Sequence, residues 1–287
     1  MDLTFLRFMT ALAIIWHMAK DIKVLVCGAA GKMGQSVVRA VDAEAGFKLV
    51  AAVDRSGNPN IGKDIGTLCG ISETGIKLSG DLKEAISKST PDVMVDFTMP
   101  EIVFINTEIA LKAGIRVVIG TTGMTKEDIN ELSKLSKQNG VGAIVAPNFA
   151  IGAVLMMKFA SEASKYFAHA EIIEFHGNKK LDSPSGTAIK SAELMTEKRK
   201  EFNSDTIKGK ELIKNARGAQ AIGNINIHSV RLPSLVAHEE IILSGTGQLL
   251  TIRHDSYDRT SFMPGVLMAI KKVMITDHLI YGLENIV

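Results

Sequence analysis

A short apolar run followed directly by closely spaced glycines constrains the fold of this chain more than any other feature. Ile22–Cys27 is of strand type, GAAGKMG follows it, and Gln35–Ala43 has helical spacing. Gly28, Gly31 and Gly34 form GxxGxxG, a variant of the GxGxxG motif. A tight turn and the close approach of backbone to a pyrophosphate both need residues without a Cβ, and the helix N-terminus then faces the anion. The pattern predicts a dinucleotide-binding strand, turn and helix; the alternative is a glycine-rich turn without a ligand.

The next predicted strand ends in an acidic residue. Lys48–Val53 runs into Asp54, and an acid at this place in a dinucleotide fold hydrogen-bonds the adenosine ribose. Lys32 and Arg55 are cations that could accept a 2′-phosphate, so NADH and NADPH both stay open, and Arg55 could equally be a solvated surface charge. A P-loop is excluded because no GxxxxGK[ST] string can be laid over the glycines.

Strands and helices alternate up to Phe149, which predicts a parallel sheet covered on both faces. One strand runs into GTTG at 120–123, where small hydroxylated residues are well placed to meet a ligand. The predicted strands are 92–97, 117–119 and 142–146, and the predicted helices are 103–113 and 128–139.

The pattern changes after Phe149, where three strands in succession predict a second, α+β domain with an antiparallel or mixed open sheet. We expect 22–149 and 257–287 to form a Rossmann-type dinucleotide-binding domain, with the last helix packing back on it. We expect 150–256 to bind substrate and to oligomerise. The predicted strands are 225–230, 239–243 and 249–254, the predicted helices are 151–168, 188–200 and 261–273, and 206–223 is expected to be an exposed loop.

The segment Glu171–Ala188, EIIEFHGNKKLDSPSGTA, concentrates the residues that can carry chemistry. Its charges, glycine and proline predict that the strand entering at Ile172 gives way to a surface loop. His176 titrates near neutrality and can transfer a proton, while Lys180 is a fixed cation suited to a carboxylate. The segment therefore predicts half of an active site. Three further histidines lie on or near predicted strands and are expected to be structural, and no pair among them has a metal-binding spacing: His228, His238 and His254.

The composition is that of a globular protein and excludes several classes. The chain has 287 residues, 46% of them hydrophobic and 22% charged, and its net charge of +2 gives no basic field for nucleic acid. Cys27 and Cys69 form neither a metal spacing nor a disulfide framework, which is typical of the cytoplasm.

The first 21 residues differ from the rest and are treated as an N-terminal extension. Leu3–Met18 is almost wholly apolar but shorter than the ~20 residues of a membrane helix. It makes a poor signal peptide because its positive charge lies inside the apolar run and no cleavage site is evident. Either Met1–His17 is a mis-assigned start before Met18, or it is a real but dispensable extension; N-terminal sequencing of the native protein distinguishes the two. No membrane association is expected.

Seven motifs lie in the same order as in the dihydrodipicolinate reductase family, the 4-hydroxy-tetrahydrodipicolinate reductases of lysine and diaminopimelate biosynthesis. They are GAAGKMG, VDFTMPE, GTTG, APNFAIG, the Glu171–Ala188 segment, IHSVRLP and LTIRHDS. The chain resembles this family over about residues 22 to 275. The resemblance implies an oxidoreductase with NADH or NADPH as hydride donor, a small dicarboxylate substrate and a homotetramer.

The resemblance also implies roles for individual residues. His176 and Lys180 fall on the catalytic positions, and Thr122, Ser185, Gly186 and Thr187 on substrate-binding positions. The cofactor-binding positions correspond to Gly28, Gly31, Lys32, Met33, Gly34, Asp54, Arg55, Gly120, Thr121, Thr122, Ala146 and Phe149. No metal is implied.

One departure from the family pattern concerns substrate binding. The family commonly has two tandem histidines, and here Gly177 follows His176. A substrate contact is therefore missing or is supplied by Asn178 or Lys179. Two other functions stay open: another amino-acid-pathway dehydrogenase on the same scaffold, such as homoserine dehydrogenase, and a non-catalytic dinucleotide-binding protein.

Overall fold

The computed structural model describes residues 21–207 and 209–287, and the apolar N-terminal segment interpreted above lies outside them. The described chain forms two compact units. The first comprises the residues up to Pro147 together with Met263–Ile286, and the second comprises Asn148–Phe262 and Val287. No helix of the described residues is both long and apolar enough to cross a bilayer.

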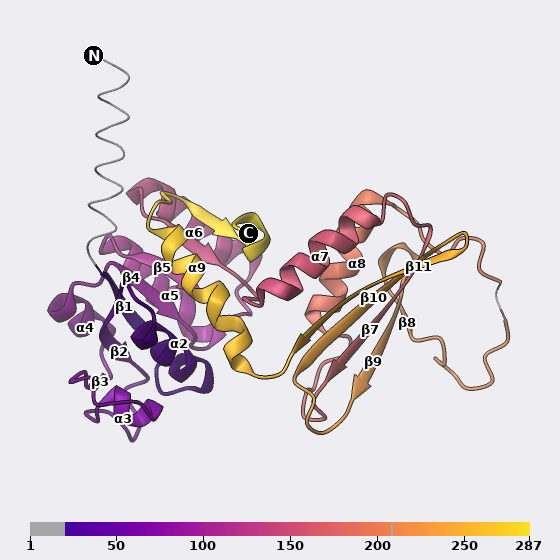
Figure 1. The fold of residues 1–287 in the computed structure, drawn as a ribbon. Coiled ribbons are helices and arrows are strands. Elements are labelled where there is room, and N and C mark those ends of the chain that lie inside the picture. The colour runs from indigo at the N-terminus through magenta and orange to yellow at the C-terminus, as the bar shows by residue number, and fades with distance from the viewer. Residues whose placement is uncertain (1–20, 208) are drawn as a thin grey trace, which may run out of the picture. The chain divides into compact units, whose positions relative to one another are not determined.

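A seven-stranded parallel sheet forms the centre of the first unit (Figure 1). Its order is β12-β6-β5-β4-β1-β2-β3, which is the Rossmann order 3-2-1-4-5-6 with one further strand beside β6. Strand order reverses between β1 and β4, so the loops after these two strands diverge at the point where such folds bind ligands. The strands are β1 (Ile22–Cys27), β2 (Phe47–Val53), β3 (Leu78–Ser79), β4 (Val93–Asp96), β5 (Arg116–Ile119), β6 (Ala143–Val145) and β12 (Leu279–Tyr281).

Helices cover both faces of this sheet, as the alternation of strands and helices predicted. Leu25 and Cys27 of β1 join a buried cluster with residues of α4, α5 and α6, whereas Val24 and Val26 point to the other face, where α2 and α9 pack together. The helix 261–273 does return to the first unit, and it begins at Met263. The helices are α2 (Lys32–Ala43), α3 (Ile65–Cys69), α4 (Leu82–Ser89), α5 (Pro100–Lys112), α6 (Lys126–Asn139) and α9 (Met263–Val273).

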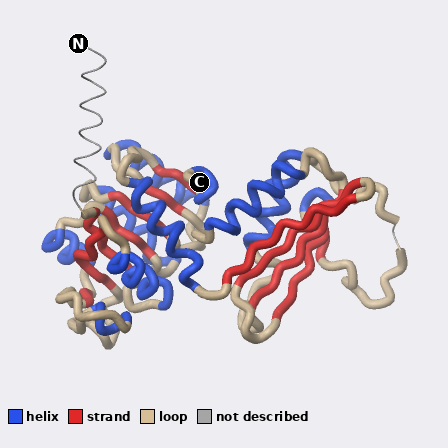
Figure 2. The backbone as a smooth tube through the Cα atoms, viewed as in Figure 1, coloured by secondary structure: helices blue, strands red, loops and turns tan. Residues whose placement is uncertain are grey.

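The second unit is a five-stranded mixed sheet with two helices on one face (Figure 2). Its order is β11-β10-β7-β9-β8; only the β7–β9 pair is parallel, which confirms the predicted mixed sheet. The elements are α7 (Ile151–Ala163), β7 (His169–His176), α8 (Gly186–Lys198), β8 (Ala219–Gln220), β9 (Asn226–Arg231), β10 (Ala237–Gly245) and β11 (Gln248–Ser256).

Two predicted element ends in this unit were wrong by three residues or more. The helix expected over 151–168 ends at Ala163. The strand expected to give way near Ile173 instead continues to His176, because a charged residue within it, Glu174, is paired inside the sheet and does not need solvent. His176 therefore lies at the end of a strand and not in a loop, and its backbone is held by pairing on both sides.

Candidate active site

The glycine turn after β1 is packed so closely that two of its positions exclude a side chain. Gly28 has a φ of 73°, and a Cβ there would lie 2.4 Å from the carbonyl oxygen of Phe97, in the loop after β4. A Cβ on Gly34 would lie 2.0 Å from the carbonyl oxygen of Gly28. The turn thus brings α2 against β1 and the loop after β1 against the loop after β4, as a dinucleotide site requires.

A cavity of about 590 Å³ opens beside this turn in the first unit. Gly28, Gly31, Asp54 and Arg55 line it, and residues of the loop after β4, including Thr98, complete it. The Asp54 carboxylate accepts hydrogen bonds from the backbone N–H of Ala30 at 3.0 Å and from Asn58 at 3.1 Å, which ties the end of β2 to the glycine turn. Four of the predicted cofactor residues therefore meet in one cavity.

The other residues assigned to the cofactor are not part of the lining of that cavity. Lys32 is exposed, Met33 is half-buried, and both stand in the first turn of α2. Gly120 packs against the ring of Phe97, which does line the cavity. Thr121 is buried and Thr122 is exposed after β5, while Ala146 and Phe149 are both buried after β6.

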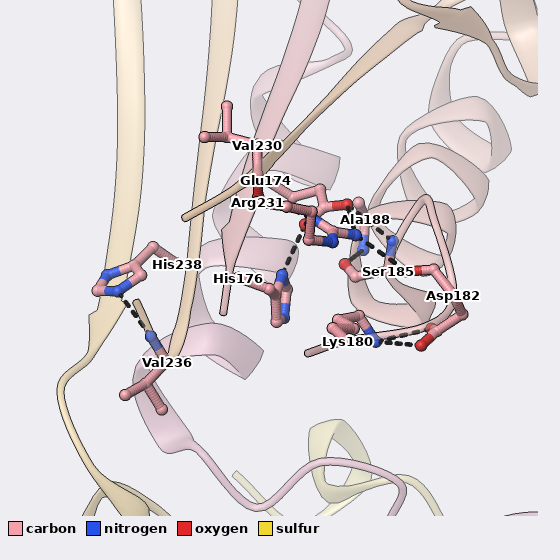
Figure 3. Close-up of polar contacts among 10 residues, drawn as sticks. All are labelled: Glu174, His176, Lys180, Asp182, Ser185, Ala188, Val230, Arg231, Val236 and His238. Atoms are coloured by element: carbon pink, nitrogen blue, oxygen red, sulfur yellow. Dashed lines mark hydrogen bonds and ion pairs between the residues drawn. The ribbon is translucent and has the colours of Figure 1, made fainter. Parts of the chain in front are cut away.

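His176 is oriented by a carboxylate two residues earlier on the same strand (Figure 3). Residues i and i+2 of a strand share a face, and Glu174 Oε2 lies 2.6 Å from His176 Nδ1. Arg231, the residue that pairs with His176 from β9, donates from both terminal guanidinium nitrogens to the two carboxylate oxygens at 2.7 Å each. The Glu174 carboxylate is fully buried and holds both the imidazole and the guanidinium in place.

These contacts set the protonation of the pair. Burial raises the pKa of the Glu174 carboxyl, but hydrogen bonds from Arg231, Ser229 and His176 outweigh it and leave that pKa below its ordinary value. Burial lowers the pKa of the His176 imidazole, Glu174 opposes this, and the charges of Lys180 and Arg231 lower it further, so that the net pKa lies below the ordinary value. Glu174 is consequently an ionised acceptor, and its Oε2 lies at Nδ1 of the imidazole ring.

The rest of the segment forms a turn and a helix start. The backbone N–H of Lys180 donates to the Gly177 carbonyl, and the Lys180 ammonium contacts both carboxylate oxygens of Asp182 at 2.8 and 2.6 Å (Figure 3). Ser185 is the N-cap of α8 and accepts from the N–H of Ala188, so the helix expected from residue 188 begins two residues earlier, at Gly186. The N–H groups of Gly186 and Thr187 thus stand at the positive end of a helix, where a carboxylate binds well.

Comparison with known proteins decides the family. Models described as "Dihydrodipicolinate reductase, N-terminus" and "Dihydrodipicolinate reductase, C-terminus" match residues 22–149 and 152–287. A 4-hydroxy-tetrahydrodipicolinate reductase of Syntrophomonas wolfei subsp. wolfei is 49% identical over 269 residues, which cover 94% of this chain and 100% of the relative. One from Listeria monocytogenes serotype 4b is 49% identical over 265 residues, covering 92% and 99%. The chain belongs to the dihydrodipicolinate reductase family.

Solved structures agree with this assignment. A dihydrodipicolinate reductase from Paenisporosarcina sp. TG-14 with bound dipicolinate has a TM-score of 0.83 at 45% identity, covering 93% of this chain and 100% of that one. An amine dehydrogenase from Mycobacterium smegmatis has a TM-score of 0.67 at 15% identity, covering 93% and 96%, and is alike in fold alone. The predicted fold class and enzyme class are confirmed: the chain is an oxidoreductase of the dihydrodipicolinate reductase family.

Gly177, which the resemblance sets at the position of a second histidine, stands in a confined place. A Cβ added there would lie 3.0 Å from the backbone carbonyl oxygen of Leu235, so that the neighbouring loop would have to yield by a few tenths of an ångström. Asn178 and Lys179, the two suggested substitutes for the missing histidine, are both exposed, whereas the Lys180 side chain is 25% exposed.

Sequence reasoning missed three polar residues that support the sites of this family member. The spacing of Glu174 and His176 was a usable signal, since i and i+2 share a face of a strand. Arg231 lay inside the IHSVRLP motif, but its partner could be found only from the β7–β9 register. Asp96 is fully buried at the end of β4, where it accepts from Thr98, from Asn106 at 2.9 Å and from Thr121 at 2.9 Å.

The three histidines expected to be structural each take part in a local contact. His228 lies 2.5 Å from Glu171, His238 lies 2.7 Å from Asp255, and His254 lies 3.1 Å from the hydroxyl of Ser256. No group of three or more His, Cys, Asp or Glu side chains within 21–207 and 209–287 is arranged to hold a metal ion.

Proposed function

We propose that this chain reduces 4-hydroxy-tetrahydrodipicolinate to tetrahydrodipicolinate with NADH or NADPH, in lysine and diaminopimelate biosynthesis. The observation that carries the proposal is the oriented histidine at the end of β7, followed within one short turn by Lys180 and the N-terminus of α8. A proton donor, a cation and a set of backbone N–H groups in this arrangement suit the reduction of a small dicarboxylate. The 4-hydroxy-tetrahydrodipicolinate reductases of similar sequence support the choice of substrate.

The first unit is proposed to bind the cofactor. The residues fit a dinucleotide, because the glycine turn leaves no room for a Cβ at Gly28 or Gly34 and the cavity beside it is lined by Asp54 and Arg55. Asp54 suits the ribose hydroxyls, and Arg55 with Lys32 suits a 2′-phosphate, so both cofactors are proposed. The bound nicotinamide supplies the hydride. Gly120, Thr121, Thr122, Ala146 and Phe149 are proposed to surround its ring.

The second unit is proposed to hold the substrate and to supply the proton. Lys180, Ser185, Gly186 and Thr187 bind substrate carboxylate groups, the lysine through its charge and the others at the start of α8. Thr122 contributes a further contact from the first unit. The 4-hydroxyl group of the substrate leaves as water, and the ring that remains is conjugated and electron-poor. Hydride delivery to a carbon of this ring leaves negative charge, and His176 neutralises it by donating a proton from Nε2, since Nδ1 faces Glu174.

The test is the loss of NADH or NADPH absorbance with freshly prepared product of dihydrodipicolinate synthase. Turnover is expected with at least one of the two cofactors. His176→Gln is expected to lower kcat by roughly 100- to 10,000-fold, the usual contribution of a general acid. His169→Gln, at the other end of the same strand, is the matched control and should keep full kcat. The absence of turnover with either cofactor would refute the proposed reaction.

The same assay separates the two alternative functions. A related dehydrogenase would oxidise or reduce cofactor with homoserine or another amino-acid-pathway substrate, so a substrate panel identifies it. A non-catalytic protein would bind NADH without turning it over.

A homotetramer in the cytoplasm is proposed with this function. In the second unit α7 and α8 lie against one face of the sheet, and the other face carries half-buried apolar side chains at Ile173, Phe175 and Ile242. Such a face is suited to a second copy of the sheet. Light scattering after size exclusion should give roughly four times the chain mass of 30.9 kDa, and a monomer at micromolar concentration would contradict the tetramer.

A further inference from the structure

The Glu174 carboxylate is the only described group that contacts His176, Arg231 and the start of the Ser185 turn together. Its Oε2 lies 2.6 Å from His176 Nδ1, its two oxygens accept from Arg231 at 2.7 Å each, and its Oε1 also accepts from the backbone N–H of Ser185 at 3.2 Å. A side chain that holds the proton donor on one side and the N-cap of α8 on the other controls the distance between them.

We propose that Glu174 is a positioning residue, whose carboxylate fixes the Nδ1–H tautomer of His176 and thereby leaves Nε2 as the nitrogen that exchanges the proton with substrate. The inference deepens the proposed function and rests on it. Glu174 itself is fully buried, so it acts on the reaction through His176 and does not touch the reacting atoms.

The burial of Glu174 explains why Arg231 is needed. An isolated carboxylate at zero exposure would take up a proton, and a protonated carboxyl would compete with Nδ1 as donor. Hydrogen bonds from the bidentate guanidinium, from Ser229 and from His176 together keep the carboxylate ionised. Arg231 also donates to the backbone carbonyl of Asp182 at 3.0 Å. Arg231 therefore fixes the acceptor on one side and the Lys180–Asp182 turn on the other (Figure 3).

The charges around the His176 ring come from three elements. Glu174 stands on the same strand, Arg231 on β9, and the Lys180–Asp182 ion pair on the turn that follows. On β10, Glu239 faces Glu174 and not the ring. Removing Glu174 and removing Arg231 must therefore move the His176 titration in opposite directions, because one group favours the imidazolium and the other opposes it.

The experiment follows the His176 ring nitrogens by ¹⁵N NMR across pH, with His176→Gln to assign the signals. In the wild-type protein the neutral ring should carry its proton on Nδ1. Glu174→Gln should lower the His176 pKa, and Arg231→Met should raise it. The basic limb of the pH profile of kcat/KM should move in the same two directions, since the acid must be protonated to act.

A double variant guards against loss of folding. Glu174→Gln alone leaves the Arg231 guanidinium, whose side chain is 19% exposed, without its partner, which can unfold a protein. Glu174→Leu with Arg231→Met leaves no unpaired charge at this place and no acceptor for the Nδ1 proton. The double variant should remain folded and lose the preference for the Nδ1–H tautomer. An unchanged tautomer in the double variant, or single variants that both shift the pKa in the same direction, would overturn the proposal. The NMR result does not depend on turnover, so an inactive wild-type protein would refute the proposed function and leave this test standing.

Discussion

At the scale of single residues, Glu174 and Glu239 lie directly opposite each other on β7 and β10, yet their carboxyl groups have different partners. The Glu174 carboxylate accepts two hydrogen bonds from the guanidinium of Arg231, and these bonds help to keep the carboxylate ionised. Glu239 accepts a hydrogen bond from the hydroxyl of Ser191 at 2.5 Å. Burial raises the pKa of the Glu239 carboxyl to about 7; the bond from Ser191 opposes this rise, and the charge of Glu174 adds to it. One carboxyl serves as a charged acceptor and the other stays largely neutral up to about pH 7.

The raised pKa of Glu239 predicts a pH-dependent loss of stability. The folded carboxyl holds its proton more tightly than the unfolded one, so the free energy of unfolding falls as pH rises from about 4.5 to about 7. Glu239→Gln keeps an acceptor for Ser191 but cannot ionise. The free energy of unfolding of Glu239→Gln, compared with that of the wild type, should rise by up to about 3 kcal/mol between acid and mildly alkaline pH. Urea unfolding at a series of pH values measures this difference.

Glu240→Gln is the matched control for that series. Glu240 follows on the same strand but points to the other face, where it pairs with Arg253 at 2.9 Å. Its pH dependence of unfolding should stay close to that of the wild type. Parallel curves for the wild type and Glu239→Gln would show that Glu239 does not titrate in this range.

Lys180 and Lys179 are adjacent lysines that provide a second matched pair. Lys180→Ala removes the cation proposed to hold a substrate carboxylate, so KM should rise by roughly 10- to 100-fold and kcat should fall as well. Lys179→Ala removes an exposed charge and should leave both constants nearly unchanged. Steady-state kinetics with varied dicarboxylate decides between them, and an effect confined to Lys179→Ala would reverse the assignment.

At the scale of elements, the glycine turn between β1 and α2 leaves no room for a Cβ at Gly28 or Gly34. Gly34→Ala would place a methyl group 2.0 Å from the Gly28 carbonyl oxygen. Because that oxygen is a backbone atom, the clash can be relieved only if α2 moves away from the turn. NADH affinity, followed by cofactor fluorescence, should fall by roughly tenfold or more. Gly57→Ala adds the same methyl group where nothing lies within 4 Å and should bind NADH as the wild type does. Equal affinities for the two variants would remove the turn from the cofactor site.

The strand β7 shows where pattern reasoning fails at this scale. A charged segment with glycine and proline indicates a surface loop when the sequence is considered alone. The residues after Ile173 were interpreted in that way, and the first of them is Glu174. Its charge is satisfied by a residue 57 positions later, so the strand continues to His176. Strand and helix types elsewhere followed from local patterns. The helices α3 and α4 and the strands β3, β8 and β12 were not predicted, and all of these except α4 carry too few residues to show a period.

At the scale of the whole molecule, the chain leaves its first unit at Pro147 and returns at Met263. The returning segment contributes α9, which packs on α2, β5 and β6, and the edge strand β12 beside β6. The N-terminal family model covers residues 22–149, but the first unit also needs α9 and β12 from the C-terminal end of the chain.

Deletion of residues 263–287 should thus damage the first unit, although it leaves the glycine turn intact. The fully buried side chains of Val266, Ile270 and Val273 would be lost from the core. Soluble protein should fall sharply, and the remainder should not bind NADH, because losing several buried side chains costs more than the stability of a typical domain. A chain that begins at Met18 is the control and should bind NADH normally, since β1 begins only at Ile22. A folded, NADH-binding deletion variant would show that α9 and β12 are dispensable.

The sequence by itself determined the fold class, the family and the candidate residues, because glycine spacing, strand and helix periods and the Glu171–Ala188 motif are local properties. His176, Lys180, Ser185 and Asp54 could all be named from such patterns. Only the tertiary structure decided how the glycine-turn residues meet around one cavity, and which partners hold His176 in place. Arg231 is far from Glu174 in the chain and next to it in the sheet, and the register of β7 against β9 is set by packing over the whole second unit, which no local pattern contains.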